Sequence, residues 1–173
     1  MFFEALERVS RIGQRHAGKV YTPEGLTRLI RSQFKDPGLR FYTERESGID
    51  SGNFILKGEY RPYEDSHNEP SIHITLTFPK RQQRAYIDRY DWDRLGFIIA
   101  DTLTHEYIHQ LHCRRRGYQH GPGYRDRKNL HYADTMQDYL GCEDEIIAFG
   151  FNIASEMVVY QSKMERTRIY SLY

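Results

Sequence analysis

Apolar residues in the first part of the chain recur at the spacing of two amphipathic helices. In residues 2–16 the apolar positions of the first helix are Phe3, Leu6, Val9 and Ile12. The second helix is expected to begin after Thr22, because a threonine side chain can cap a helix and Pro23 then occupies the favoured first helical position. A turn sequence at residues 36–38 predicts its end.

The hydrophobic pattern then changes from helical to alternating, which predicts strands at residues 40–44, 53–60 and 71–78. The third segment alternates most clearly. The residues expected to face a core are Ile72, Ile74, Leu76 and Phe78. The residues between them are Ser71, His73, Thr75 and Thr77. This alternation is typical of a half-buried antiparallel strand with one face on a core.

Two longer helices are predicted in the second half of the chain. The third helix is expected over residues 91–115 with Asp91 as its capping residue, and its broad apolar side indicates that it is largely buried. The final helix is expected from about residue 142 to about residue 163, after an irregular segment at 117–141. Helices at both ends of a short antiparallel or mixed sheet predict an α+β fold in a single domain, residues 1–173.

The third helix carries the sequence His-Glu-x-x-His, with His105, Glu106 and His109. Two histidines four residues apart project from one face of a helix, so both imidazoles can bind one tetrahedral zinc ion. The glutamate lies on the neighbouring stripe, where it can take a proton from a zinc-bound water and pass it to a leaving amine.

In a chain of this length with eight histidines, this motif arises by chance with a probability of about a few per cent, estimated from composition. The context argues against chance. Two histidines and a glutamate on a mostly apolar helix cost several kcal/mol when they are buried without partners, and a metal ion satisfies all three.

A catalytic zinc site needs a third protein ligand, and two residues compete for that role. Glu145 shares a polar stripe with Asn152 and Glu156 on the otherwise apolar final helix, so its carboxylate can face the His-Glu-x-x-His helix. His120 is the alternative, although a histidine in a loop before a turn is common without any ligand role.

Other polar residues near the motif have weaker assignments. Glu143 and Asp144 are read as first-turn acids that complement the helix dipole. His112 and His131 are candidates for outer-shell partners or donors to an oxyanion. Tyr132 and Tyr139 are candidates for donors to a tetrahedral intermediate, although a packing role is expected for each in a chain with 14 tyrosines.

Charge and cysteine content indicate which partners and which cellular compartment to expect for the protein. The 25 Lys and Arg nearly balance the 24 Asp and Glu, so no global field drives the chain onto nucleic acid or a membrane. Two isolated cysteines, Cys113 and Cys142, indicate free thiols in a reducing compartment. No signal peptide and no span of about 20 apolar residues is present, so a cytoplasmic location is expected.

The motif followed by Glu-x-x-Ala near the start of the next helix resembles the gluzincin zinc metallopeptidases. More narrowly, Tyr-Leu-Gly followed by Asp-Glu-Ile-x-Ala-Phe-x-x-Asn-Ile-Ala is similar to metallopeptidases encoded by tailed bacteriophages. In such families the zinc ligands correspond to His105, His109 and Glu145, and the catalytic base corresponds to Glu106. Gly150 departs from the pattern, where alanine is expected. The resemblance covers roughly the carboxy-terminal third of the chain.

This resemblance implies a small zincin-like fold in which the sheet packs on the motif helix and an edge strand binds substrate. We then expect an extended peptide to pair with the free edge of strand 71–78. The implied activity is hydrolysis of peptide bonds by a zinc-activated water, with a protein or peptide as the substrate. The implied location is the host cytoplasm, if the chain is encoded by a phage.

Two rival functions stay open. His120-Gly121-Pro122 is similar to a segment that supplies a third histidine ligand in SprT-like proteases, which implies a DNA-associated protease. Basic runs such as Arg114–Arg116 allow contact with nucleic acid, although the balanced net charge does not favour it. The other rival is a non-catalytic zinc-binding module, in which His120 or Cys142 would complete a closed site.

Overall fold

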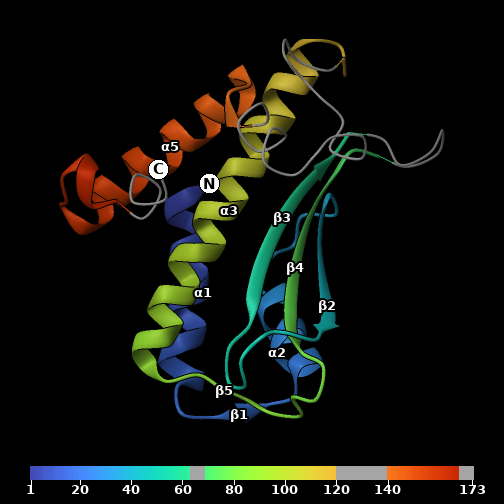
Figure 1. Cartoon of the computed structure of the whole chain (residues 1–173), viewed down its shortest axis with the longest axis vertical. Coiled ribbons are helices and arrows are strands. Elements are labelled where there is room, and N and C mark those ends of the chain that lie inside the picture. The colour runs from blue at the N-terminus through green and yellow to red at the C-terminus, as the bar shows by residue number, and fades with distance from the viewer. Residues whose placement is uncertain (63–68, 120–139, 168–173) are drawn as a thin grey trace. The chain divides into compact units, whose positions relative to one another are not determined.

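The computed structural model describes residues 1–62, 69–119 and 140–167 (Figure 1). The chain divides into two compact units, Met1–Leu103 and Thr104–Tyr173. The described residues form α-helices and a small mixed sheet, so the predicted α+β class is confirmed.

The first unit holds most of the secondary structure. In chain order its elements are α1 (Phe2–His16), β1 (Val20–Tyr21), α2 (Pro23–Arg31), β2 (Leu39–Glu46), β3 (Ile55–Arg61), β4 (Ser71–Pro79), β5 (Ala85–Tyr86) and the first part of α3 (Arg89–Arg115). The predicted helices and the three longer strands are confirmed, with α2 ending earlier than the predicted turn. The short strands β1 and β5, which pair antiparallel, are not indicated by the sequence pattern.

Strand β4 lies in the middle of a three-stranded sheet of order β2-β4-β3 (Figure 1). It runs parallel to β2, with Leu39 opposite Ile72, and antiparallel to β3, with Tyr60 opposite the same residue. Both edges of β4 are therefore paired. The expectation that a substrate adds to a free edge of this strand is wrong, because β2 and β3 form the outer strands of the sheet that the structure describes.

The prediction that β4 is half-buried is also wrong. Three of its four polar side chains are as buried as its apolar ones, since Ser71 and His73 are each 4% exposed and Thr77 is not exposed at all, while Thr75 is partly buried. The register places Arg40 on one side of His73 and Glu59 on the other, and the ring of Tyr42 lies 5.0 Å from the His73 ring. Long side chains of the two flanking strands thus surround the polar face of the central strand.

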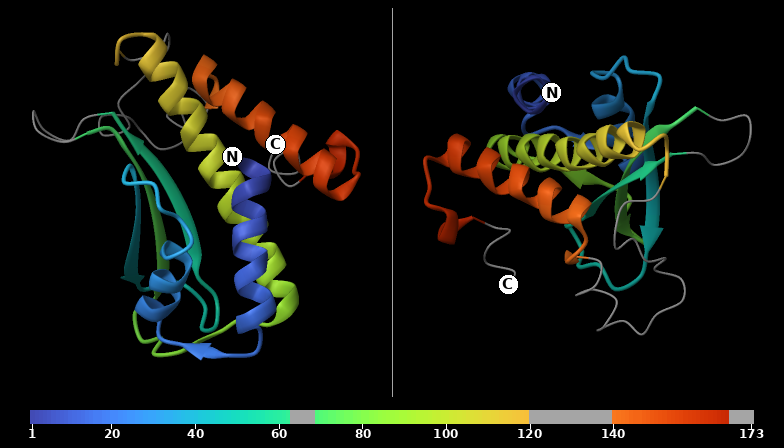
Figure 2. Two further views of the ribbon diagram at one scale, coloured as in Figure 1. Left: turned by 180° about the vertical axis from the view of Figure 1, so that it is seen from behind. Right: turned by 90° about the horizontal axis from the view of Figure 1, so that it is seen from above.

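Helix α1 packs against the first part of α3 through small residues (Figures 1 and 2). A Cβ added to Gly13 would lie 2.7 Å from Cβ of Trp92, and one added to Gly96 would lie 3.5 Å from Val9. The buried stripe of α1 consists of Phe2, Ala5, Val9, Ile12 and Gly13. Phe3, which the spacing places on that stripe, is 62% exposed, so this part of the prediction is wrong.

Side-chain caps define the starts of two helices. The Thr22 hydroxyl accepts a hydrogen bond from the Gly25 backbone N–H at 3.1 Å, as its sequence context predicts. Helix α3 begins two residues before its predicted start. There the Asp88 carboxylate accepts from the Asp91 backbone N–H at 2.8 Å, so Asp88 performs the role predicted for Asp91.

The second unit contains the last part of α3, helix α5 (Glu143–Tyr160) and the short 3-10 helix η2 (Met164–Arg166). Cys142 precedes α5, and Gln161 ends it in the left-handed conformation, close to the predicted limits. A Cβ at Gly150 would meet no atom within 4 Å, so the departure from alanine there does not disturb packing. Among the described helices, none combines the length and apolar character that a membrane span requires.

Candidate metal centre

Helix α3 places His105 and His109 one turn apart on the same face, and their ring centroids lie 4.7 Å from each other. Both side chains are largely buried, with 13% and 16% of their surface exposed. The rings therefore converge on a sheltered position.

Glu145, in the first turn of α5, completes this cluster (Figure 2 shows α5 beside the end of α3 that carries the histidines). One carboxylate oxygen lies 3.1 Å from Nε2 of His105, and the other lies 3.3 Å from Nε2 of His109. Ligand atoms of these three residues all lie within 4.8 Å of one another, so the group could hold a metal ion. The structure thus brings together the three residues predicted as metal ligands.

Asn152 fixes the orientation of the first histidine. Its side-chain oxygen lies 2.9 Å from Nδ1 of His105, and the residue is 2% exposed. With an N–H at Nδ1 donating to this oxygen, a metal-bound His105 would present its Nε2 lone pair on the side of Glu145. The Phe149 ring, 4.7 Å away, packs on the same imidazole. The sequence placed Asn152 on the Glu145 stripe but gave no indication of its partner.

The electrostatics of the cluster favour a proton on His105. Burial works to lower the pKa of this imidazole, but hydrogen bonds with Glu145 and Asn152 and the negative charge of Glu106 outweigh burial and raise the pKa. A divalent cation would meet the same negative environment. The site is therefore suited to a positive charge, whether it is a proton or a metal ion.

Glu106 is buried beside the cluster, with 8% of its surface exposed. It does not belong to the three residues whose ligand atoms converge. Its negative charge nevertheless acts on His105. A buried carboxylate that neighbours a possible metal position without being a ligand is a candidate for a general base.

A second polar contact joins α3 to α5 next to the cluster. The Arg116 guanidinium donates two hydrogen bonds to the Asp144 carboxylate, one of them at 2.9 Å, and Nδ1 of His112 lies 3.1 Å from the same carboxylate. Burial works to raise the pKa of Asp144, but Arg116 and His112 outweigh it and lower the pKa. The interpretation of Asp144 as only a dipole-complementing surface acid is incomplete, because it bonds to His112 on α3 and to Arg116, the residue that follows α3.

Several candidates from the sequence lie outside the described residues: His120, His131, Tyr132 and Tyr139. Cys142 is described and is partly buried, but it does not belong to the converging group. Burial raises the pKa of its thiol, which disfavours the thiolate form that binds metals. Among the described histidines, cysteines, aspartates and glutamates, no residue other than these three candidate ligands joins the cluster.

Comparison of the chain with protein-family models, with curated proteins and with solved structures found no match. The family resemblances of the motifs therefore remain predictions. The function has to be inferred from the chemistry of the metal centre itself.

Proposed function

We propose that this protein is a zinc-dependent peptidase with a zincin-like arrangement, in which His105, His109 and Glu145 hold zinc and Glu106 is the general base. The observation that carries the proposal is the convergence of two imidazole nitrogens and one carboxylate oxygen within 4.8 Å. Two histidines and one carboxylate are a common ligand set of catalytic zinc.

A zinc ion in such a site lowers the pKa of a bound water and polarises a substrate carbonyl. The residues of the chain supply the remaining chemistry. Glu106 accepts the proton of the attacking water and delivers it to the leaving amine, which splits the peptide bond into a carboxylate and an amine. Asn152 keeps the lone pair of His105 on Nε2.

The number of converging residues in the described part of the chain matches the number of protein ligands of a catalytic zinc site. A structural zinc site is closed by four protein ligands, whereas a catalytic site has three and leaves one position for water. In the described part of the chain, three residues converge. The same ligand set also suits iron(II) in oxygenases, but a glutamate between the two histidines supports hydrolysis.

Metal analysis of the purified chain tests the ligand assignment. Wild-type protein should bind one zinc per chain, and His105→Ala, His109→Ala and Glu145→Gln should each reduce the bound metal. Glu143→Gln is the matched control, because Glu143 is an exposed acid in the same turn of α5. Zinc retained by Glu145→Gln would exclude Glu145 as the third ligand, and iron in place of zinc would overturn the hydrolase proposal.

Cleavage of a labelled peptide library or of an unfolded protein tests the activity. Glu106→Gln should keep the metal and lower the rate about 10²–10⁴-fold, because it removes the general base. Unchanged cleavage by this variant would remove Glu106 from the mechanism. We propose a protein or peptide as the substrate and do not favour nucleic acid, given the net charge of +1.

A further inference from the structure

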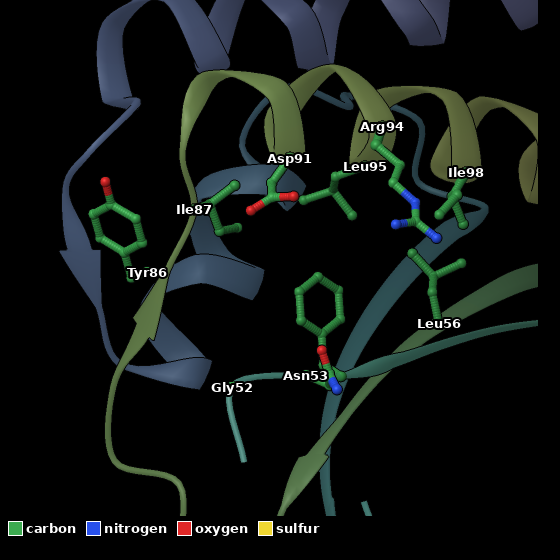
Figure 3. A pocket seen from close by; sticks show the side chains of 10 residues that line it. Gly52, Asn53, Leu56, Tyr86, Ile87, Asp91, Arg94, Leu95 and Ile98 are labelled. Carbon is green, nitrogen blue, oxygen red and sulfur yellow. The ribbon is translucent and has the colours of Figure 1, made fainter. Parts of the chain in front are cut away.

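The first unit contains a cavity of about 260 Å³ that shares no residue with the metal centre. Its walls come from the first turns of α3, from β5 and the residue after it, and from the start of β3 with the residues before it (Figure 3). This cavity lies just below the range of about 300–1,000 Å³ of sites for drug-sized ligands. A ligand that fits it is therefore small.

One side of the cavity is apolar. Leu95 and Ile98 project from α3, and Leu56 projects from β3 towards them (Figure 3). Leu95 is 4% exposed, while Leu56 and Ile98 are only partly buried. An apolar ligand group placed here would bury surface that these side chains leave accessible, which favours binding.

Two opposite charges lie on either side of Leu95. Figure 3 shows the Asp91 carboxylate and the Arg94 guanidinium flanking Leu95, and both charged residues line the cavity. Opposite charges three or four residues apart on a helix commonly pair, as Glu4 and Arg8 do on α1 at 2.5 Å. Within the described part of the chain, the side chains of Asp91 and Arg94 form no ion pair with each other or with a third residue.

We propose that this cavity binds a free α-amino acid with a large apolar side chain, such as leucine. The Asp91 carboxylate accepts hydrogen bonds from the ligand ammonium, and the Arg94 guanidinium donates to the ligand carboxylate. The apolar side chain of the ligand packs on Leu56, Leu95 and Ile98. The proposal is independent of the peptidase assignment, because none of these residues belongs to the metal centre.

Titrations followed by NMR or calorimetry test the ligand class with the whole chain in the presence of a chelator. L-leucine should bind at least about threefold more tightly than N-acetyl-L-leucine, which lacks the ammonium, or L-leucinamide, which lacks the carboxylate. Glycine carries both charges without an apolar side chain and should not bind. Equal binding of L-leucine and both derivatives, or no saturable signal up to about 10 mM L-leucine, would overturn the proposal.

Two variants assign the charges. Asp91→Asn should remove the preference for L-leucine over N-acetyl-L-leucine, and Arg94→Gln should remove the preference over L-leucinamide. Asp93→Asn and Arg89→Gln are matched controls, because both residues are exposed on α3 and do not line the cavity. Variants at Asp91 and Arg94 that bind all three compounds as wild type does would show that the charges take no part.

Discussion

The hydrogen bond between Asn152 and His105 leads to the sharpest prediction about the metal centre. Replacing Asn152 by alanine removes the oxygen that accepts from Nδ1, 2.9 Å away, in a place where the asparagine is only 2% exposed. Water has little access, so the N–H of the imidazole loses its partner without full replacement. His105 is then free to rotate or to move its proton to Nε2, and both changes oppose metal binding.

The expected magnitude follows from that loss. Outer-shell partners of metal-binding histidines typically change metal affinity about 10–100-fold, which corresponds to about 1.4–2.7 kcal/mol. The metal-free variant should also lose about 1–3 kcal/mol of unfolding free energy, because a buried polar group is left unsatisfied. Asn152→Asp retains an acceptor oxygen and adds negative charge, so it should bind zinc at least as tightly as wild type.

Competition with a chromophoric zinc chelator at neutral pH measures these affinities, and circular dichroism checks that each variant folds. The decisive comparison is between Asn152→Ala and Asn152→Asp, which differ in the acceptor. If the alanine variant binds zinc within about threefold of wild type while remaining folded, Asn152 does not orient the ligand and the inferred tautomer of His105 is wrong.

Further predictions concern packing and pH. Gly13→Ala should lower the free energy of unfolding by about 1–2 kcal/mol, because the new Cβ would lie 2.7 Å from Cβ of Trp92. Gly150→Ala has open space and should raise the free energy of unfolding by about 0.5–1 kcal/mol. Urea unfolding measures both changes, and two changes of the same sign would contradict this packing. Burial and the charges of Arg61 and Arg40 lower the pKa of His73 in the folded protein. In the unfolded chain the pKa of this histidine is near 6.5. The free energy of unfolding should therefore decrease as the pH falls below about 6.5, because the unfolded chain then binds a proton that the folded protein does not. Stability measured from pH 7 to 5 should therefore fall less in His73→Gln than in wild type, and an equal fall would show that another group titrates.

The sequence predicts those features that depend on neighbours along the chain. Alternation locates β4, and the spacing of His105 and His109 places both imidazoles on one face of a helix, because each depends only on local backbone geometry. The polar stripe on the final helix made Glu145 one of two candidates for the third ligand, beside His120. These inferences needed no knowledge of tertiary contacts.

Features that depend on distant contacts could not be predicted in this way. The polar residues of β4 alternate as on a solvent-facing side, yet His73 is buried because side chains of the neighbouring strands, such as Tyr42, pack beside it. Asn152 meets His105 across 47 positions, and Arg116 meets Asp144 across 28. Local propensity and periodicity carry no information about such pairs.

The two oxygens of Glu145 have a consequence for how the cluster would take up a metal ion. Each oxygen lies within hydrogen-bond distance of one imidazole, so the three side chains are already close together. Because the pKa of His105 is raised, an ion bound here would displace a proton into solution. Loading would then be an exchange of one cation for another at a preassembled position, and it would become more favourable as the medium becomes more alkaline.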